Sequence, residues 1–215
     1  MVVKVVIGAN FGDEGKGLMT DYFCHQSALR GEKCLVVLHN GGAQRGHTVV
    51  TPDGKRHVFH HFGSGTFAGL DTYLSENFIL NPMVFRKELE ELELFGVSPT
   101  VYVHPLCRVT TTYDMMANQI MEEKRGRNRH GSCGLGVFET AKRYEERDMF
   151  PIWKLKAFDN ACSIMMKDCK NYLYQLLERR SINIADDWKN IIASDGLIEH
   201  FADDLKFMAE HISLS

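Results

Sequence analysis

The sequence predicts an α/β fold with a parallel-sheet core and flanking helices, built around a variant P-loop and followed by a helical carboxyl-terminal part. Two observations lead to this prediction. The apolar, β-branched run 2–7 enters a glycine-rich turn and leaves it as a helical pattern. A second apolar run, 34–38, follows that helix. Strand, helix and strand then form a βαβ unit, which implies parallel strands.

Length and composition indicate a single α/β domain over residues 1–215, divided into a core, 1–156, and a helical region, 157–215. Hydrophobic residues make up 44% of the chain and charged residues 25%, as in ordinary globular proteins. The net charge of −3 argues against nucleic acid as a partner, and no apolar run is long enough to span a membrane. The start lacks the layout of a signal peptide, and six dispersed cysteines suit reduced thiols, so we expect a cytoplasmic protein.

The first half is read from apolar runs and glycine turns. Residues 1–7 predict a buried strand because all of them except Lys4 are apolar. A helix is expected to end near Leu29, and 34–38 form the next strand. A second glycine-rich turn follows and ends at His47. Ligands of parallel sheets bind beyond the carboxyl ends of the strands, so we expect both turns to meet over one ligand.

Three histidines follow a predicted hairpin turn at 51–55, which contains Asp-Gly. Of His57, His60 and His61, strand alternation places only His57 and His61 on one face. On a regular strand these two lie roughly 13 Å apart. A metal site is one interpretation, but packed or solvated strand histidines fit this spacing better.

The second half alternates strands and helices before it becomes helical. Residues 75–80 predict a strand that ends before Asn81, and Pro82 suits the first turn of a helix. The apolar residues of this helix share one face, Gly96 ends it, and its acidic residues are expected on a solvated surface. The remaining expected elements are a strand at 101–104, a helix at 111–124, a glycine loop at 131–136, and helices at 162–180 and 187–211.

The turn from Gly8 to Gly17 has the properties of a phosphate cradle. Its glycines let backbone N–H groups point at an anion, the helix N-terminus adds partial positive charge, and Lys16 adds a full charge. The spacing departs from the usual P-loop, since Gly8 lies seven residues before Gly15 and Asn10 stands where a glycine is needed. A glycine-rich turn without a ligand is the alternative interpretation.

Two motifs together resemble the paired signatures of the adenylosuccinate synthetase family. The first, Gly-Asp-Glu-Gly-Lys-Gly at 12–17, matches residue for residue. The second, 41–48, keeps its glycines and His47. It departs at Gln44, where the family has Asn, and at Arg45, where the family has Ala. The order and separation of the two motifs make the resemblance specific.

A third stretch, 131–136, resembles the glycine loop with which the family holds the 5′-phosphate of its nucleotide substrate. Ser132 keeps a hydroxyl, whereas Cys133 replaces a Thr and Leu135 replaces an Arg. A thiol is a weak donor, so this loop differs most from the family pattern. Family members are about twice as long, and the elements that bind aspartate and guanine in their second half are absent from this sequence.

The resemblance implies a ligase of purine biosynthesis that joins IMP and L-aspartate to adenylosuccinate through 6-phosphoryl-IMP. GTP would be its co-substrate, Mg²⁺ its cofactor and a homodimer its assembly. Asp13 is then the base at the purine N1, and His47 is the acid that follows the transferred phosphate. The Asp13 carboxylate and the Gly46 carbonyl would bind Mg²⁺. The implied GTP-binding residues are Gly12, Asp13, Glu14, Gly15, Lys16, Gly17, Leu18, Gly46, His47 and Thr48.

The resemblance also implies a set of residues for the substrate nucleotide. In the family, an arginine of one subunit reaches the substrate phosphate of its neighbour, and both Arg143 and Arg147 lie near that position. The implied contacts are Asp13, Lys16, Gln44, Arg45, Gly46, His47, Ser132, Cys133 and Arg147.

Each of these assignments has an alternative. Asp13 could instead cap the helix N-terminus, and His47 could be a buried, satisfied histidine. Arg45 could be a surface residue or an additional phosphate or carboxylate contact. The whole chain could be a non-catalytic or truncated nucleotide-binding relative, or a synthetase for a different purine nucleotide.

Overall fold

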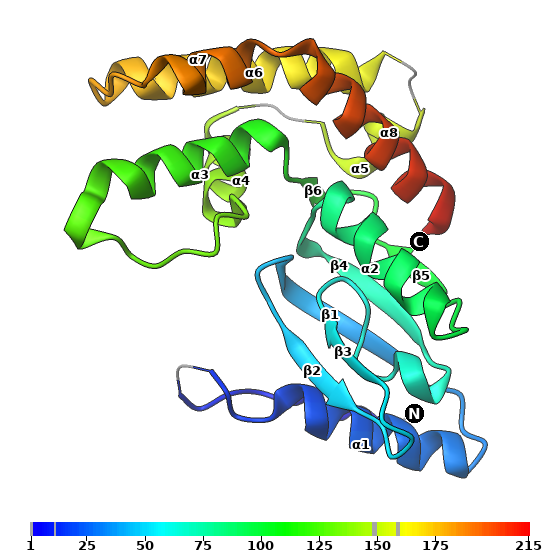
Figure 1. Ribbon diagram of the computed structural model, residues 1–215. Helices are drawn as coiled ribbons and strands as arrows, with labels where there is room; N and C mark the ends of the chain where they lie inside the picture. Colours follow the sequence, from blue (N-terminus) through cyan, green and yellow to red (C-terminus); the bar gives the residue numbers. More distant parts are fainter. Residues whose placement is uncertain (1, 11, 148–149, 158–159) are drawn as a thin grey trace.

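A computed structural model describes residues 2–10, 12–147, 150–157 and 160–215. Helices and strands alternate through the first half, and helices dominate the second (Figure 1). In chain order the elements are α1 (Lys16–Leu29), β1 (Leu35–Gly42), β2 (His47–Val50), β3 (Arg56–Phe59), η1 (Thr66–Ala68), β4 (Asp71–Leu80), α2 (Pro82–Leu94), β5 (Val101–Val103), β6 (Arg108–Val109), α3 (Thr112–Arg125), η2 (Gly126–Asn128), α4 (Val137–Glu146), α5 (Ile152–Ala157), α6 (Ala161–Arg179), α7 (Asp186–Ala193), α8 (Asp195–His211) and β7 (Ile212–Leu214).

The main sheet is parallel, as the sequence predicts. Its strands follow the order β1-β4-β5-β7, and β6 continues the pairing along the end of β4. Val37 pairs with Tyr73, Tyr73 with Tyr102, and Tyr102 with Ser213. The pairing of β7 with β5 joins the end of the chain to the centre of the fold.

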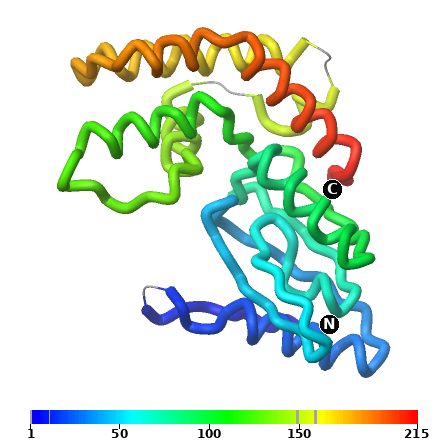
Figure 2. Tube along the Cα trace, viewed as in Figure 1, coloured from blue at the N-terminus to red at the C-terminus, as the bar shows by residue number. Residues whose placement is uncertain are grey.

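Helices surround this sheet on several sides. α1 packs beside β2, and α2 and α8 lie against each other (Figures 1 and 2). The helices α3, α4, α6 and α7 gather at the far end from α1 (Figure 2). Between the sheet and α2 lies an aromatic core in which Phe59, Phe62, Phe78 and Phe85 are fully buried. The predicted α/β architecture with a helical carboxyl-terminal part is therefore confirmed.

The predicted hairpin is also confirmed. β2 and β3 pair antiparallel, with Thr48 opposite Val58, and the backbone N–H of Thr51 donates to the carbonyl of Lys55 across the turn. This hairpin starts at His47, so the second glycine loop connects the end of β1 to it. The loop thereby lies at the carboxyl end of a parallel strand, where ligands of α/β proteins bind.

The helix α2 forms as its sequence predicts. The Asn81 side chain accepts a hydrogen bond from the Val84 N–H at 3.2 Å, which caps the N-terminus, and Pro82 occupies the first turn. Phe85, Leu89 and Leu92 are buried. The expectation that the acidic residues of this helix are solvated is wrong for Glu88, whose surface is only 3% exposed. Glu88 shares the buried face because it lies three residues after Phe85 and one before Leu89.

The predicted strand at the amino terminus does not form. From Val2 onward the segment pairs with no other described strand, and Val2, Val5 and Ile7 are 77–85% exposed. A buried strand of a parallel sheet needs cover on both faces. The neighbouring strand β1 has no such cover on one face, because Leu35 and Val37 are 45% and 55% exposed. The prediction that residues 1–7 form the first strand of a βαβ unit is therefore wrong.

His57 and His61 are packed histidines, but their predicted separation is wrong. His57 is 4% exposed and His61 is fully buried. The strand β3 ends at Phe59, and the chain then bends around one carboxylate. The Glu88 carboxylate lies 3.7 Å from His57 Nε2 and 3.4 Å from His61 Nδ1. The estimate for a regular strand fails because the strand stops between the two rings.

The helix predicted at 187–211 is two helices, α7 and α8. Ser194 between them has an extended backbone, with ψ of 124°. Ser194, Asp195 and Gly196 all have low helix propensity, so the break falls where three weak helix formers meet. The helix predicted at 162–180 is confirmed as α6. Among the helices of the described ranges, none combines the length and the apolar character needed to cross a membrane.

Candidate functional site

The first glycine loop gathers hydrogen-bond donors around one carboxylate. The backbone N–H groups of Ala9 and Asn10 each donate to Glu14 Oε1 at 2.6 Å, and Lys16 Nζ lies 3.5 Å from Glu14 Oε2. Hydrogen bonds from these amides and the charge of Lys16 lower the pKa of the Glu14 carboxyl. These donors are of the kind that bind a phosphate oxygen. The motif does not identify Ala9 and Asn10, because every residue except proline has a backbone N–H and residue type does not show which of these groups bind.

Asp13 does not cap α1. The N-cap of this helix is Gly15, whose left-handed φ of 75° begins the first turn, and no side chain caps it. Asp13 is exposed and has a left-handed φ of 52°. Few residues other than glycine adopt this conformation. Within the described ranges no group hydrogen-bonds to its carboxylate.

The second glycine loop carries two basic side chains, Arg45 and His47, in different environments. Arg45 points inward: its Nη2 donates to the Phe62 carbonyl at 3.0 Å, and its guanidinium lies 6.0 Å from the Phe78 ring centre. Burial lowers the pKa of Arg45 to about 10. Arg45 is therefore neither a fully solvated surface residue nor aimed outward at a ligand, whereas Gln44 is exposed.

His47 is half-buried at the start of β2. Burial and the positive charges of Arg45 and Lys16 lower its pKa to about 4. The ring is therefore neutral near pH 7, whereas its residue type alone suggested a pKa near neutrality. A neutral imidazole still offers one N–H donor and one acceptor nitrogen.

The two loops meet at Gly17 and His47. A Cβ on Gly17 would lie 2.8 Å from His47 Cβ and 3.2 Å from His47 Cα, so only glycine permits this approach. The start of α1 is thereby pressed against the start of β2, as Figure 1 shows for the two elements. This approach also places Lys16, which directly precedes Gly17, near His47.

The third glycine loop is held by α3. Glu122 Oε2 accepts hydrogen bonds from the N–H groups of Gly131 at 3.0 Å and Ser132 at 3.4 Å. The Ser132 hydroxyl donates to Asn118 Oδ1 at 2.9 Å, and Cys133 is exposed. No hydrogen bond or ion pair within the described part of the chain joins this loop to the other two. The sequence did not point to Glu122, since one acid in a charged helix is an ordinary surface feature.

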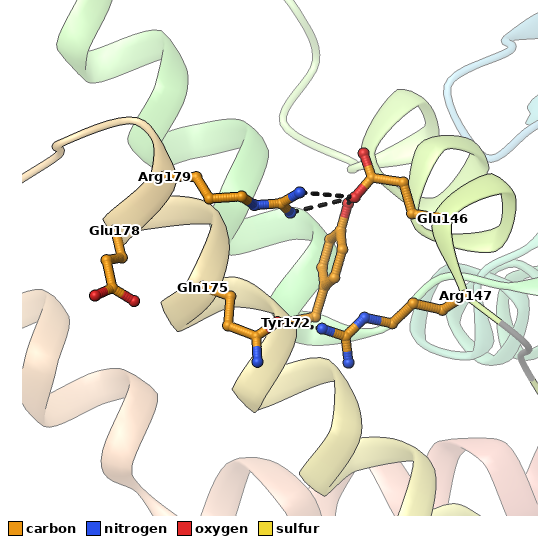
Figure 3. A pocket seen from close by; sticks show the side chains of 6 residues that line it. All are labelled: Glu146, Arg147, Tyr172, Gln175, Glu178 and Arg179. Atoms are coloured by element: carbon orange, nitrogen blue, oxygen red, sulfur yellow. Dashed lines mark hydrogen bonds and ion pairs between the residues drawn. The ribbon is translucent and has the colours of Figure 1, made fainter.

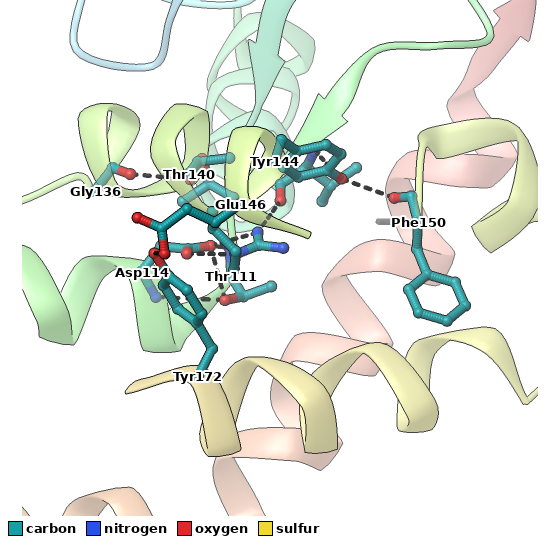
Figure 4. Close-up of polar contacts among 11 residues, drawn as sticks. Thr111, Asp114, Gly136, Thr140, Tyr144, Glu146, Phe150 and Tyr172 are labelled. Atoms are coloured by element: carbon teal, nitrogen blue, oxygen red, sulfur yellow. Dashed lines mark hydrogen bonds and ion pairs between the residues drawn. The ribbon is translucent and has the colours of Figure 1, made fainter. Parts of the chain in front are cut away.

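A buried ion pair fixes α4 behind this loop. Arg143 Nε and Nη2 each lie 2.7 Å from a different oxygen of the Asp114 carboxylate, and Nη2 also donates to the Val109 carbonyl at 3.0 Å. Figure 4 shows Asp114 beside Thr111 at the start of α3. Arg143 is fully buried and Asp114 is 3% exposed. A Cβ on Gly136 would lie 2.6 Å from the Asp114 carbonyl carbon, so the start of α4 sits directly on α3. Arg143 is thus part of the interior and is not accessible to a ligand.

Arg147 lies on the surface beside a cavity of about 340 Å³. Its guanidinium hydrogen-bonds Gln175 and lies 5.1 Å from the ring centre of Tyr172 (Figure 3). Arg143 and Arg147 both lie near the position of the arginine that crosses to a neighbouring subunit in the family. Of these two, Arg143 is buried and Arg147 lies at the surface. The lining residues are Glu146, Arg147, Tyr172, Gln175, Glu178 and Arg179, whose charges balance.

Sequence comparisons agree with the resemblance of the motifs. The sequence model of the adenylosuccinate synthetase family matches residues 5–214. The adenylosuccinate synthetase of Acaryochloris marina is 34% identical over 149 residues, which cover 68% of this chain and 32% of that protein. The enzyme of Lactobacillus acidophilus is 32% identical over 142 residues, again covering 32% of its length. The match thus spans about a third of the length of these curated relatives.

Comparison with solved structures extends the match to nearly the whole chain. The fully ligated adenylosuccinate synthetase of Plasmodium falciparum aligns with 96% of this chain and 45% of its own, with a TM-score of 0.68 and 20% identity. The succinoaminodeoxyadenylate synthetase of cyanophage S-2L, bound to dGMP and dATP, aligns with 64% of this chain and 36% of its own. Its TM-score is 0.50 and its identity 21%. At these identities the structures show a similar fold.

Proposed function

We infer the function from one premise: the chain belongs to the adenylosuccinate synthetase family, whose sequence model matches residues 5–214. We propose that it is a GTP-dependent ligase that joins IMP and L-aspartate to adenylosuccinate by way of 6-phosphoryl-IMP. The observation that carries this proposal is the contact of Gly17 with His47, since it assembles one site from the two motifs that identify the family.

Asp13 is proposed as the base that removes the proton from N1 of IMP. This proton must leave because the 6-oxygen is a weak nucleophile while its electrons are shared with the ring. Asp13 is suited to this role because it is exposed, does not cap α1, and has no hydrogen-bond partner in the described part of the chain. A carboxylate within reach of N1 can take the proton directly.

His47 and Lys16 are proposed to follow the phosphoryl group. Charge gathers on that group during transfer, and donors that are already oriented stabilise it. Lys16 and the amides of Ala9 and Asn10 supply such donors once the Glu14 carboxylate moves aside. His47 is neutral near pH 7 because burial, and then the charges of Arg45 and Lys16, lower its pKa. A bound triphosphate would offset those charges and raise the pKa of His47, which favours its action as an acid.

Mg²⁺ would be held by the Asp13 carboxylate and the Gly46 carbonyl. Within the described residues, no group of three or more His, Cys, Asp or Glu side chains could hold a metal ion. Mg²⁺ commonly binds through only one or two carboxylates together with substrate phosphates, and the exposed Asp13 can supply one such carboxylate. The ion would neutralise negative charge on the nucleotide phosphates, so that the Asp13 carboxylate would not repel the nucleotide.

The remaining proposed contacts concern the substrate phosphate. Ser132, Cys133 and Arg147 are proposed to contact it, with Arg147 acting across a homodimer because Arg143 is committed to Asp114. The proposed location is the cytoplasm, and the proposed architecture is one domain in which 1–156 form the nucleotide-binding core.

A second candidate function is nucleotide binding without catalysis. It is favoured by Cys133, whose thiol is a weak donor at a position where the family has a Thr that binds the substrate phosphate. A different purine nucleotide is a further possibility for the substrate. The similar fold of the cyanophage S-2L enzyme, together with Gln44 and Arg45 in the second loop, makes dGMP with dATP the alternative pair to test.

The test incubates the protein with IMP, L-aspartate, GTP and Mg²⁺ and measures succinyl-AMP by chromatography. We expect product from the wild type and none from Asp13→Asn. Binding of a fluorescent GTP analogue should be retained because Lys16 and the backbone amides of the loop are unchanged. A parallel arm replaces IMP and GTP with dGMP and dATP. Folded protein that binds GTP but forms no product in either arm would replace the ligase proposal with the binding candidate, and an active Asp13→Asn variant would remove Asp13 as the base.

A further inference from the structure

A buried carboxylate lies beneath the second glycine loop, on an element that supplies none of the proposed ligand contacts. Glu88 belongs to α2 and is only 3% exposed. A buried charge is costly unless hydrogen bonds compensate for the lost water. The groups that compensate Glu88 therefore indicate what it holds in place.

Glu88 binds a short run of backbone directly after β3. Its Oε1 accepts from the N–H of His60 at 2.7 Å and of Phe62 at 3.3 Å, and its Oε2 accepts from the N–H of His61 at 2.7 Å. Burial favours the protonated form, but the close imidazoles of His57 and His61 and the hydrogen bond from the His61 N–H outweigh it and lower the pKa of Glu88 to about 2. The carboxylate is therefore charged and fixes the direction of 60–62.

The segment 60–62 in turn holds the second glycine loop at two points. His60 Nδ1 donates to the Ala43 carbonyl at 2.8 Å, and the Phe62 carbonyl accepts from Arg45 Nη2 at 3.0 Å. Ala43 and Arg45 flank Gln44, and His47 follows two residues after Arg45. The contacts thus run from α2 through 60–62 to the loop that ends at His47.

We propose that Glu88 is a positioning residue for the candidate site: its carboxylate holds 60–62, and 60–62 hold the second glycine loop so that His47 faces Gly17. This inference rests on the proposed function, to which it adds a residue that touches no ligand. A carboxylate that merely fills the core would stabilise the fold without setting the geometry of His47.

The experiment compares Glu88→Gln with Glu91→Gln. Gln keeps the shape of Glu but removes the charge and turns one acceptor into a donor, which must then face a backbone N–H. Glu91 is a matched control because it also lies on α2 and beside His57, at 3.6 Å from Nδ1, yet its side chain is 47% exposed. Two quantities are measured at neutral pH: the affinity for a fluorescent GTP analogue with Mg²⁺, and the imidazole NMR signals of His47.

For Glu88→Gln we expect at least tenfold weaker nucleotide binding and displaced His47 signals, with helicity by circular dichroism retained. For Glu91→Gln we expect affinity within twofold of the wild type and unmoved signals. If Glu88→Gln binds nucleotide like the wild type and leaves the His47 signals in place, the proposal is overturned.

A second variant covers the case in which Glu88→Gln does not fold. His60→Phe removes the hydrogen bond to Ala43 and keeps a ring of similar size, so it breaks the same chain of contacts at a less buried link. Displaced His47 signals and weaker binding in His60→Phe support the proposal, and wild-type behaviour refutes it. If the wild type itself binds no nucleotide, the proposed function fails, while the His47 signals still decide whether Glu88 positions the loop.

Discussion

At the scale of single residues, His47 has the most informative electrostatic setting in the candidate site. Burial and the nearby charges of Arg45 and Lys16 hold its pKa at about 4, against 6.5 for the free side chain. The folded chain therefore resists protonation of this ring more than the unfolded chain does. One of the charges responsible, Lys16, also belongs to the proposed phosphate site, so an arrangement that prepares the site lowers stability in mild acid.

We predict that the free energy of unfolding falls as pH is lowered from about 6.5 towards about 4. Between these pH values His47 is protonated in the unfolded chain but neutral in the folded chain, so protonation favours unfolding. Urea unfolding at about pH 7 and about pH 5 measures the loss, and this range avoids most of the titration of Glu88. The His47→Gln variant should lose part of the pH dependence; an unchanged dependence would show that the shift belongs to other groups.

Arg143 and Arg147 should respond oppositely to the same substitution. Arg143→Met leaves the Asp114 carboxylate buried without its partner, and we expect a loss of about 3–5 kcal/mol in the free energy of unfolding. Arg147→Met removes a half-buried surface side chain that contacts Gln175 and should cost less than about 1 kcal/mol. Urea unfolding measures both. Equal costs would contradict the assignment of Arg143 to the interior and Arg147 to the surface.

Some residues of the site could be predicted from the sequence and others could not. Sequence motifs predict Lys16, Gly17 and His47 because a motif is defined by residue types at fixed spacing. In the structure these residues lie close together. Glu88 was missed because neighbouring acids suggested a solvated surface. A signal was present, since residues 85, 88, 89 and 92 follow the spacing of one helical face. The role of the Ala9 and Asn10 amides has no such signal, because it depends only on backbone geometry.

At the scale of elements, the site depends on how closely α1 approaches β2. We predict that Gly17→Ala destabilises the chain by about 1–3 kcal/mol and weakens nucleotide binding, because its Cβ would lie 2.8 Å from His47 Cβ. Gly196→Ala in α8 is the matched control, since a Cβ there meets only Ser194 Oγ at 3.6 Å. It should leave binding unchanged and stabilise the chain by up to about 1 kcal/mol. Thermal unfolding and the fluorescent GTP analogue measure the two effects.

The elements were predicted well where local signals agree with packing. The cap Asn81, Pro82 and the apolar face of α2 all indicate one helix, and that helix forms. Residues 1–7 have a strong strand pattern, yet no strand forms, because pairing and cover must come from elsewhere in the fold. An apolar, β-branched pattern shows that a segment is suited to a buried strand. It does not show that the rest of the fold provides a pairing strand and cover on both faces.

At the scale of the whole molecule, the pairing of β7 with β5 and the packing of α8 on α2 tie the helical region to the sheet. We therefore predict one cooperative unfolding transition in urea. Trp188 lies in α7 of the helical region and Trp153 in α5 at its boundary with the core, so tryptophan fluorescence reports the carboxyl-terminal helices. The NMR signals of His47 report the sheet end of the core. Coincident midpoints support a single domain over 1–215, and separate midpoints would divide the chain.

The exposed segment from Val2 to Ile7 also affects how the purified chain behaves in solution. It is apolar and β-branched, and Lys4 is its one charge. Among the described strands, β1 also pairs on one side only. Such sequences join edge to edge and nucleate aggregates, and a single lysine is a weak gatekeeper against this. Colloidal stability of the chain should therefore fall steeply with concentration, and adding charge near Val3 or Val5 is the direct means to improve it.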